Sequence, residues 1–429
     1  MNYSKAIAFI YSTIPMFHLV GKKAYKADLN NTLDLDKHLK HPDKSFKSIH
    51  VAGTNGKGSV SHMLAAVLQD SGYRTGLFTS PHIKDFRERI KVNGLMISED
   101  EVAEFVTKNK SFIEKIQPSF FELTTLMAFD HFREHEVEYA VIETGLGGRL
   151  DSTNIIKPIL SVITNISWDH ADLLGDSLEK IATEKAGIIK QNVPVVIGEY
   201  QNEINLVFED KADELNAELT YADKIYFVND SIQTVDDLQM FRVEKNKKPF
   251  LEGLKTPLLG NYQKKNVATV LASIEKLKEK GLQIADSNIY RGIKNVINTT
   301  GLKGRWQILS HKPMIICDTG HNEGGIKQIV SQLKKIKKDK LYIVFGMVAD
   351  KEVNEILKLL PKEAIYYFTN ADSPRALKAE ELKKAANAFG LKGESYSSVK
   401  DAFSKAKSSA SPDDVVFIGG STFVVAEVL

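Results

Sequence analysis

The run Val51-Ala52-Gly53-Thr54-Asn55-Gly56-Lys57-Gly58-Ser59 constrains the fold of this chain more than any other stretch. An apolar, strand-like segment that includes Ile49 precedes it, and apolar residues at helical spacing follow it from Val60 to Leu68. A strand, a glycine-rich turn and a helix in this order direct backbone N–H groups at an anion. The sequence therefore predicts a phosphate-binding loop within an α/β fold, with ATP as the ligand.

Each residue type in this loop has a chemical use. Glycines allow positive φ and close approach of the backbone, Lys57 can neutralise the β- and γ-phosphates, and the Ser59 hydroxyl can reach a magnesium ion. The loop is shorter than the standard P-loop, and Gly58 separates the lysine from the serine. A plain glycine turn is the alternative. The predicted nucleotide contacts are Gly53, Thr54, Asn55, Gly56, Lys57, Gly58 and Ser59.

Length, charge and cysteine content narrow the class of protein. A chain of 429 residues suits two or three domains, and a net charge of +2 gives no reason to expect a nucleic-acid or membrane partner. The single cysteine, Cys317, cannot form an intrachain disulfide, which fits a reducing compartment. We expect a cytoplasmic protein, since no run approaches the roughly 20 apolar residues of a membrane span. We also expect a monomer, since the sequence shows no extra dimerisation element.

Apolar strands alternate with amphipathic helices from residue 46 to 198, which predicts a mostly parallel sheet covered by helices on both faces. Ligands of such sheets bind beyond the carboxyl ends of the strands. The expected strands are 48–52, 75–79, 139–143, 160–165 and 194–197, and the expected helices are 58–70, 98–116, 121–134 and 178–190.

Residues 199–256 are richer in charge and contain short β-like pieces at 219–221, 225–228 and 240–243, so we expect a peripheral extension there. A helix over 262–279 follows, and the polar stretch 298–305 marks a domain boundary. The predicted domains are 1–298, an ATP-binding P-loop domain, and 299–429, a smaller Rossmann-like α/β domain. The latter has expected strands at 314–317, 341–345, 365–368 and 415–418, and helices at 325–337, 353–360, 379–389 and 399–408.

Oxygen-bearing side chains at strand ends are candidate magnesium ligands. Glu143 ends the apolar segment 139–142 and precedes a glycine-rich loop, although a strand-end ion pair would explain it too. Ser80 follows the strand 75–79, where a turn-forming serine before proline is an equal alternative. His170 follows the strand 160–165, and histidine is a second-choice magnesium ligand.

Other polar residues carry a weaker signal. Lys185 lies beside Glu184 on the helix 178–190 and has the pattern of a solvated helical lysine. Asp318 and His321 follow a strand of the second domain. Arg305 could neutralise phosphate charge, but an ion pair between domains would explain it equally well.

Taken in order, the motifs resemble the folylpolyglutamate synthase/dihydrofolate synthase family of the Mur ligase superfamily. The resemblance runs from the phosphate loop to the C-terminus, and the run from Glu143 to Asn154 is its most specific part. The motifs are Gly53–Ser59, Ser80-Pro81-His82, Phe120–Thr125, Glu143–Asn154, Asp169-His170, Glu184–Gly187, Gly304-Arg305-Trp306 and Asp318–Asn322.

This resemblance implies an ATP-dependent ligase that joins L-glutamate to dihydropteroate or to a reduced folate through an acyl phosphate, with ATP and Mg²⁺ as cofactors. A requirement for K⁺ and the choice of pterin substrate stay open. The resemblance implies that Lys185 is carried as a carbamate that ligates a second metal, and that His321 lies near the transferring phosphate. It further implies metal ligation by Ser59, Ser80, Glu143 and His170, ATP contacts from Asn266, Arg305 and Asp318, and pterin contacts from Phe121, Glu122, Leu123, Thr124, Leu150, Asp151 and Ser152.

Three other readings remain open on the sequence. A cell-wall Mur ligase has the same chemistry, but only about 50 residues precede the phosphate loop, too few for a typical additional domain. A non-catalytic nucleotide switch would not require glutamate for turnover. An ordinary kinase would leave a stable phosphate ester rather than an amide and free phosphate.

Overall fold

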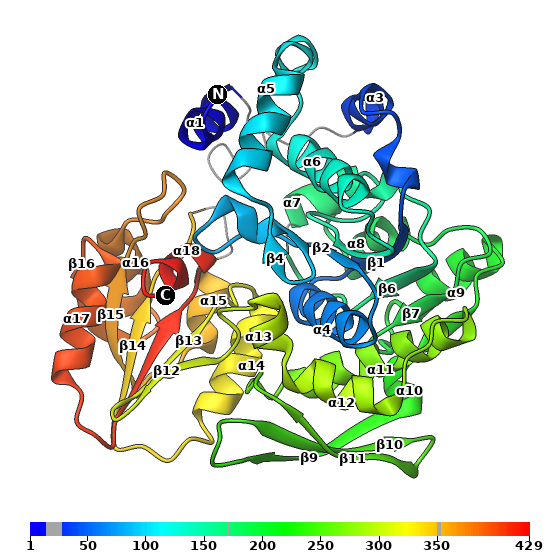
Figure 1. Cartoon of the computed structure of the whole chain (residues 1–429). Coiled ribbons are helices and arrows are strands. Elements are labelled where there is room, and N and C mark those ends of the chain that lie inside the picture. Colours follow the sequence, from blue (N-terminus) through cyan, green and yellow to red (C-terminus); the bar gives the residue numbers. More distant parts are fainter. Residues whose placement is uncertain (14–27, 170, 350–352) are drawn as a thin grey trace. The chain divides into compact units, whose positions relative to one another are not determined.

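An eight-stranded sheet and a six-stranded sheet organise the chain into two units, which are described separately (Figure 1). The structure is a computed structural model that describes residues 1–13, 28–169, 171–349 and 353–429. The first unit comprises Met1–Pro257 and Gln263–Leu302, and the second comprises Leu258–Tyr262 and Lys303–Leu429. The domain boundary expected at residue 298 stays a prediction.

The sheet of the first unit has the order β4-β3-β2-β5-β1-β6-β7-β8, and all neighbouring pairs from β2 to β8 are parallel. Two short antiparallel strands, β3 and β4, extend one edge. The central strands are apolar and buried along their length, as strands covered on both faces must be. The strands are β1 Lys47–Ala52, β2 Thr75–Phe78, β3 Ile90–Val92, β4 Leu95–Met96, β5 Tyr139–Glu143, β6 Leu160–Ile163, β7 Val195–Ile197 and β8 Leu219–Tyr221.

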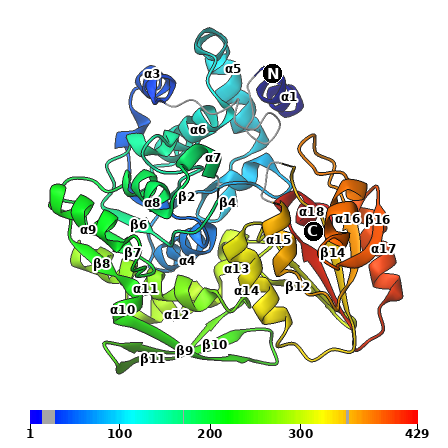
Figure 2. The ribbon, with the colours of Figure 1, turned by 180° about the vertical axis from the view of Figure 1, so that it is seen from behind.

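Helices pack against both faces of this sheet. Helices α5 and α6 share a hydrophobic cluster with β2 and β5, while α8 and α9 share one with β6 and β7. Figures 1 and 2 show α4, α11 and α12 on the opposite side from α5 and α6. The helices are α1 Tyr3–Thr13, α3 Asn30–His38, α4 Lys57–Asp70, α5 Glu99–Ile116, α6 Phe120–Glu134, α7 Ala171–Leu174, α8 Leu178–Ala186, α9 Asn205–Glu214, α10 Ala222–Ile225, α11 Gln263–Glu279, α12 Asp286–Lys294 and α13 Val296–Thr300, with 3₁₀ turns Pro42–Lys44, Phe86–Arg89 and Ser152–Ile155.

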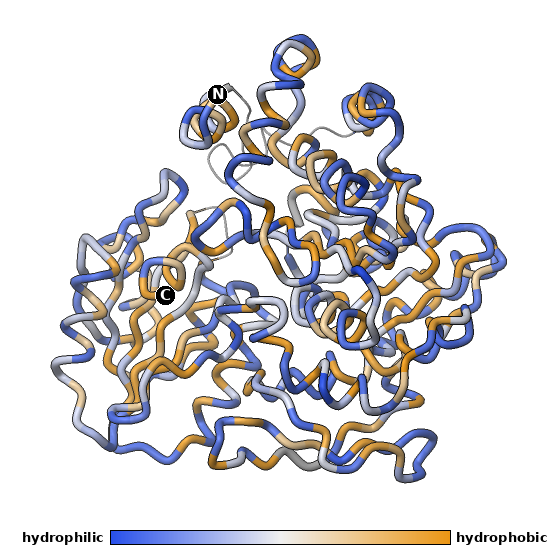
Figure 3. The backbone as a smooth tube through the Cα atoms, in the orientation of Figure 1, coloured by the Kyte–Doolittle hydropathy of each residue, from blue (hydrophilic) through white to orange (hydrophobic). Residues whose placement is uncertain are grey.

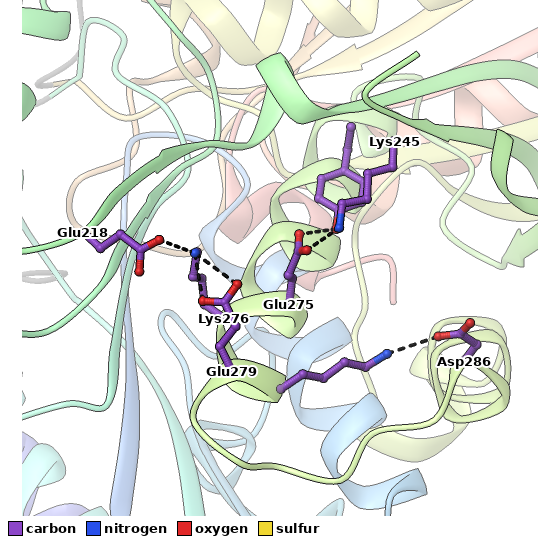
Figure 4. A network of polar contacts seen from close by, with 8 residues as sticks. Glu218, Lys245, Glu275, Lys276, Glu279 and Asp286 are labelled. Carbon is purple, nitrogen blue, oxygen red and sulfur yellow. Dashed lines mark hydrogen bonds and ion pairs between the residues drawn. The ribbon is translucent and has the colours of Figure 1, made fainter. Parts of the chain in front are cut away.

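A separate antiparallel sheet of β9 Tyr226–Gln233, β10 Gln239–Lys245 and β11 Lys248–Thr256 forms the peripheral part of this unit. Ionic contacts tie it to α11 (Figure 4). Glu275 accepts a hydrogen bond of 2.7 Å from the Tyr226 hydroxyl and pairs with Lys245. The next residue of the helix, Lys276, pairs with Glu218.

Two local expectations differ from the structure. The segment 219–221 is not part of the extension, because β8 pairs in parallel with β7 and completes the main sheet. The helix expected to reach residue 190 ends at Ala186, because the chain turns at Gly187, where a Cβ atom would lie 2.4 Å from the Cα of Arg149. A side chain at that position would push two backbone segments apart.

The second unit has its own sheet in the order β12-β13-β17-β14-β15-β16, parallel except for β12 at the edge. Its strands are mostly apolar (Figure 3), and hydrophobic clusters with α14–α16 and with α17–α18 cover its two faces. The predicted α/β class with mostly parallel sheets is confirmed. The elements are β12 Gln307–His311, β13 Met314–Asp318, α14 Glu323–Leu333, β14 Leu341–Phe345, α15 Val353–Leu359, β15 Ile365–Thr369, α16 Ala379–Asn387, β16 Lys392–Tyr396, α17 Val399–Ser409, β17 Val415–Gly419 and α18 Thr422–Ala426.

Candidate active site

The predicted phosphate loop connects β1 to α4, and two of its glycines cannot be replaced without strain. Gly53 has φ of +141° and Gly56 has φ of +90°. A Cβ atom on Gly53 would lie 1.9 Å from Oγ1 of Thr164, and one on Gly56 would lie 2.3 Å from Oδ1 of Asn266. The loop therefore needs glycine both for its backbone conformation and for close packing. The predicted nucleotide contact Asn266 lies directly against it.

The end of β6 holds the loop in shape. The backbone N–H of Thr54 donates to the carbonyl of Asn165 at 2.8 Å, and that of Asn55 donates to the Asn165 side chain at 2.9 Å. The hydroxyl of Thr164 donates to the Asn55 carbonyl at 2.6 Å. Sequence reasoning missed these supporting residues, because nothing in their local pattern distinguishes them from other strand-end polar residues. A loop fixed in this way keeps its conformation without a bound anion, which lowers the cost of binding one.

Ser59 and Asn266 are joined by a residue that sequence reasoning missed. Gln263, the first residue of α11, donates to the Ser59 hydroxyl at 3.2 Å and accepts from the Asn266 amide at 2.8 Å. All three side chains are buried. The hydroxyl in the first turn of α4 and the amide beside Gly56 are thus positioned by one hydrogen-bonded chain.

Lys57 and Lys185 converge on one oxygen atom. The ammonium group of Lys57 donates to the carbonyl of Gly53 at 2.9 Å, and that of Lys185 donates to the same carbonyl at 3.0 Å. The Lys57 ammonium group beside a glycine loop at a helix N-terminus makes this a site that attracts anions. This is the electrostatic character that a triphosphate requires.

The interpretation of Lys185 as a solvated lysine is wrong. Its side chain is buried with 4% exposure, and its neighbour Glu184 pairs with Arg149 at 2.8 Å instead. Burial, and secondarily the positive charge of Lys57, lower the pKa of Lys185 to about 7, against opposing effects of two carboxylates. Near neutral pH a large share of this amine is therefore uncharged and nucleophilic.

The two candidate metal ligands Ser80 and Glu143 lie side by side. The carboxylate of Glu143 is buried at the end of β5 and accepts a hydrogen bond of 3.4 Å from the Ser80 backbone N–H. Register pairs Glu143 with Val51, two residues before the phosphate loop. Carboxylate and hydroxyl oxygens are the donors that Mg²⁺ prefers, so this set fits the ion. His170 lies outside the described residues.

A buried arginine, Arg89, also belongs to these surroundings, and sequence reasoning missed it. Burial lowers its pKa to about 10, while the negative charge of Glu143 acts in the opposite direction. Its Nε donates to Nδ1 of His82 at 2.7 Å, and its guanidinium lies 5.1 Å from the centre of the Phe120 ring. The residue therefore stays charged and helps to fix the segment after Ser80.

The glycine-rich loop after β5 is organised by Asp151. This buried carboxylate accepts from the backbone N–H of Leu146 at 2.8 Å and of Thr153 at 3.0 Å. Burial raises its pKa, and these hydrogen bonds counteract the rise. Ser152 is buried beside it and Leu150 is half-buried. The structure gives Asp151 a structural task, and the predicted substrate contacts of these three residues stay predictions.

The segment Phe121–Thr124 begins α6 and packs against this loop. The Phe121 ring fills the space beside Gly145, where a Cβ atom would come within 2.5 Å of it. The carboxylate of Glu122 accepts from the backbone N–H of Ser119 at 2.5 Å and closes a capping box. Leu123 and Thr124 are fully buried. Their role as pterin contacts stays a prediction.

In the second unit Asp318 is the centre of a polar cluster. Its buried carboxylate accepts from the Tyr262 hydroxyl at 2.6 Å and from the backbone N–H of Trp306 at 2.8 Å. Burial raises the pKa of Asp318, while Tyr262 and then Arg305 act to lower it. His321 Nδ1 lies 3.0 Å from the Thr319 carbonyl. The structure thus brings Arg305 and Asp318 together within this unit, and their contacts with ATP stay predictions.

Comparison with known proteins decides the family. The family model of the Mur ligase middle domain matches residues 51–274, and that of the Mur ligase glutamate ligase domain matches residues 304–422. The dihydrofolate synthase/folylpolyglutamate synthase of Bacillus subtilis is 34% identical over 419 residues, covering 95% of each chain. The chain belongs to the folylpolyglutamate synthase/dihydrofolate synthase family of Mur ligases. This family assignment makes it an ATP-dependent glutamate ligase.

Solved structures of this family superimpose over the full chain. Escherichia coli FolC in complex with DHPP and ADP matches with a TM-score of 0.86 at 29% identity, covering 100% of this chain and 97% of that one. The bifunctional folylpolyglutamate synthase/dihydrofolate synthase with Mn, AMPPNP and L-glutamate bound matches with a TM-score of 0.85 at 28% identity and the same coverage. The relatives thus bind nucleotide and a divalent metal. Among the described residues, no helix combines the length and the apolar character that crossing a bilayer requires.

Proposed function

We propose that this ligase adds L-glutamate to dihydropteroate and to reduced folates, with the acceptor carboxylate activated as an acyl phosphate. A carboxylate is a poor acyl donor, so transfer of the γ-phosphoryl group of ATP to its oxygen must come first. The amine of glutamate then attacks the carbonyl carbon, phosphate leaves, and an amide forms. The ligands named for the relatives, which are DHPP, ADP, a nucleotide analogue and L-glutamate, support this choice of substrates.

The observation that carries the proposal is the phosphate loop with the Lys57 ammonium group beside it. Lys57 and Lys185 both donate to the Gly53 carbonyl, at the N-terminal end of α4. Binding a triphosphate would draw the Lys57 ammonium from this carbonyl to the phosphate oxygens, an exchange of a neutral acceptor for a charged one. Lys57 would then stabilise the charge that develops during phosphoryl transfer.

We assign Lys185 the role of a carbamate. Only the uncharged amine can attack carbon dioxide; the new N–C bond forms, one proton leaves to solvent, and the side chain becomes an anion. The lowered pKa supplies the uncharged amine at neutral pH. An anion at this position would attract the Lys57 ammonium group, whereas a protonated Lys185 would repel it. The oxygen atoms of the carbamate could also serve as ligands for a metal ion.

The remaining roles follow from the family resemblance. Ser59, Ser80, Glu143 and His170 would hold Mg²⁺, which would neutralise phosphate charge when bound. Asn266, Arg305 and Asp318 would contact ATP, with His321 near the transferring phosphate. Pterin contacts would come from Phe121, Glu122, Leu123, Thr124, Leu150, Asp151 and Ser152.

The test is product analysis with ATP, Mg²⁺ and L-glutamate and with either dihydropteroate or tetrahydrofolate as the acceptor. Phosphate release is measured together with the mass of the pterin product. We expect a gain of one glutamate from each acceptor. Turnover with tetrahydrofolate alone would restrict the enzyme to folate extension, and phosphate release with neither acceptor would refute the proposed substrates.

A further inference from the structure

Three potential metal ligands meet at the ends of α5 and α6, outside the catalytic machinery. Glu101 lies in the first turn of α5, His131 lies in the last turn of α6, and His135 follows that helix. The Oε1 atom of Glu101 is 3.5 Å from Nδ1 of His131 and 2.6 Å from Nε2 of His135. One donor atom from each residue lies within 4.8 Å of the others.

The cluster is distinct from the proposed pterin contacts on the same helix. His131 lies ten residues after Phe121, which corresponds to roughly 15 Å along a helix axis at 1.5 Å per residue. The site is therefore at the opposite end of α6 from the capping box of Glu122. None of its three residues contributes to the proposed phosphate or metal sites of the ligase.

The spacing suits a tetrahedral ion. With bonds of about 2.0–2.2 Å to nitrogen and oxygen, two ligands of a tetrahedral Zn²⁺ ion lie roughly 3.3–3.5 Å apart. The Glu101–His131 distance of 3.5 Å already meets this value. The shorter Glu101–His135 contact of 2.6 Å would lengthen by less than about 1 Å if an ion bound between the two groups. His135 is 43% exposed, so its side chain has room for that adjustment.

The carboxylate of Glu101 is held in place by an outer contact. Its second oxygen, Oε2, accepts a hydrogen bond of 2.8 Å from the Ser98 backbone N–H, which leaves Oε1 facing the histidines. Such outer hydrogen bonds orient carboxylate ligands in known metal sites. Arg74 donates to the His135 carbonyl and also pairs with Glu136 at 2.9 Å, which compensates its charge.

Two of the three groups, His131 and Glu101, have the protonation state that metal binding needs. Burial lowers the pKa of His131 to about 4, which the charge of Glu101 partly opposes, so the imidazole is neutral at pH 7. Burial would raise the pKa of Glu101, but hydrogen bonds from Ser98 and His135 hold it at about 2. The contact between Glu101 and His135 does not explain why the buried, neutral imidazole of His131 also has its Nδ1 atom 3.5 Å from the same carboxylate oxygen.

We propose that Glu101, His131 and His135 form a binding site for a divalent transition-metal cation of the Zn²⁺ type, with water as the fourth ligand. Two imidazoles and one carboxylate with an open position match the donor set of zinc sites with three protein ligands. Bound metal would connect the start of α5 to the end of α6. The site would act on stability, because it lies away from the reacting groups.

The test uses the full-length protein after treatment with a chelator. Zn²⁺ alone is titrated by calorimetry in excess Mg²⁺, which occupies the proposed ligase metal site, and Co²⁺ is titrated separately for its visible absorption. We expect one equivalent to bind with high affinity and to raise the melting temperature. His135→Ala and Glu101→Gln should each weaken binding by at least about 100-fold, the upper end of what outer-shell mutations cause.

Two matched variants serve as controls. His311→Ala removes an exposed histidine from the second unit, and Glu104→Gln changes an exposed carboxylate one turn further along α5. Both should bind Zn²⁺ as the unmodified protein does, and His135→Ala should retain ligase turnover. Because His135 and Glu104 are exposed, these variants are expected to fold. Equal Zn²⁺ affinity in His135→Ala, Glu101→Gln and the unmodified protein would overturn the proposal, as would a weak, octahedral Co²⁺ spectrum.

Discussion

Replacing Lys185 tests two effects of this residue separately. One is its chemical role in turnover, and the other is the loss of folding stability that comes from burying an amine. Its pKa of about 7 lies below the ordinary value of 10.5 for lysine. At pH 8 roughly 90% of the side chain is therefore uncharged, against about 0.3% for an ordinary lysine, a difference of roughly 300-fold in reactive amine. This excess is the reason to expect a carbamate here and not on the exposed Lys180 of the same helix.

The first assay is turnover. We expect Lys185→Ala to lower the rate of glutamate-dependent phosphate release by about 10²–10³-fold, the usual effect of removing one group that stabilises developing charge. Acetate or propionate should restore part of the activity, because a small carboxylate can occupy the place of the carbamate. Lys180→Ala, which removes an exposed lysine paired with Asp176, should have no effect. Full activity of Lys185→Ala without added acid would refute the assigned role.

The second assay is stability against pH in buffer free of carbon dioxide. Between pH 7 and 10.5 the unfolded state binds more protons at Lys185 than the folded state does, so stability rises with pH in this window. Lys185→Met lacks this dependence. The variant should therefore be more stable than the unmodified protein by roughly 4 kcal/mol near pH 7, and its advantage should shrink by about 1.4 kcal/mol per pH unit above that. An advantage that stays constant from pH 7 to pH 9 would show that Lys185 is an ordinary lysine in the folded state.

Three substitutions test the loops that form the site. Lys57→Ala should reduce ATP turnover by about 10²–10³-fold with an unchanged circular dichroism spectrum, and near-normal turnover would contradict the phosphate loop. Gly56→Ala places a side chain at φ +90° and against Asn266, so it should cost about 1–3 kcal/mol in urea unfolding and weaken ATP binding in calorimetry; retained affinity would contradict the packing argument. Gly187→Ala, whose Cβ would meet the backbone of Arg149, should cost about 1–3 kcal/mol and lower turnover, and a variant with unchanged melting temperature and rate would show that this turn is adaptable.

The strands were predictable from sequence because they are buried on both faces. Tyr139–Glu143 and Leu341–Phe345 have the bounds expected from their uninterrupted apolar runs. Elements with a polar face were missed, such as α12 Asp286–Lys294, whose short amphipathic pattern does not distinguish it from a polar loop. The edge strand β12 was missed for the same reason, since it is only half-buried.

The phosphate loop was predictable because its signal is local: glycines, a lysine and a hydroxyl stand next to each other in sequence. Arg89 and Gln263 were not predictable, because each becomes important only through residues distant in the chain. Arg89 interacts electrostatically with Glu143, and Gln263 forms a hydrogen bond with Ser59, which lies 204 positions earlier in the sequence. Periodicity and short motifs contain no information about such contacts.

Lys185 shows how a glycine pattern can position a functional residue from a distance. A Cβ atom on Gly148 would lie 2.7 Å from the Glu184 carbonyl, and one on Gly187 would lie 2.4 Å from the Cα of Arg149. The glycine-rich loop and the end of α8 therefore touch through their backbones. The N–H of Arg149 donates to the Glu184 carbonyl at 2.8 Å, and this hydrogen bond holds the two segments together. Contact at this range brings the end of α8 close enough for Lys185 to reach Gly53. The most specific run of the sequence, from Glu143 to Asn154, is thus required partly to place a lysine that it does not contain.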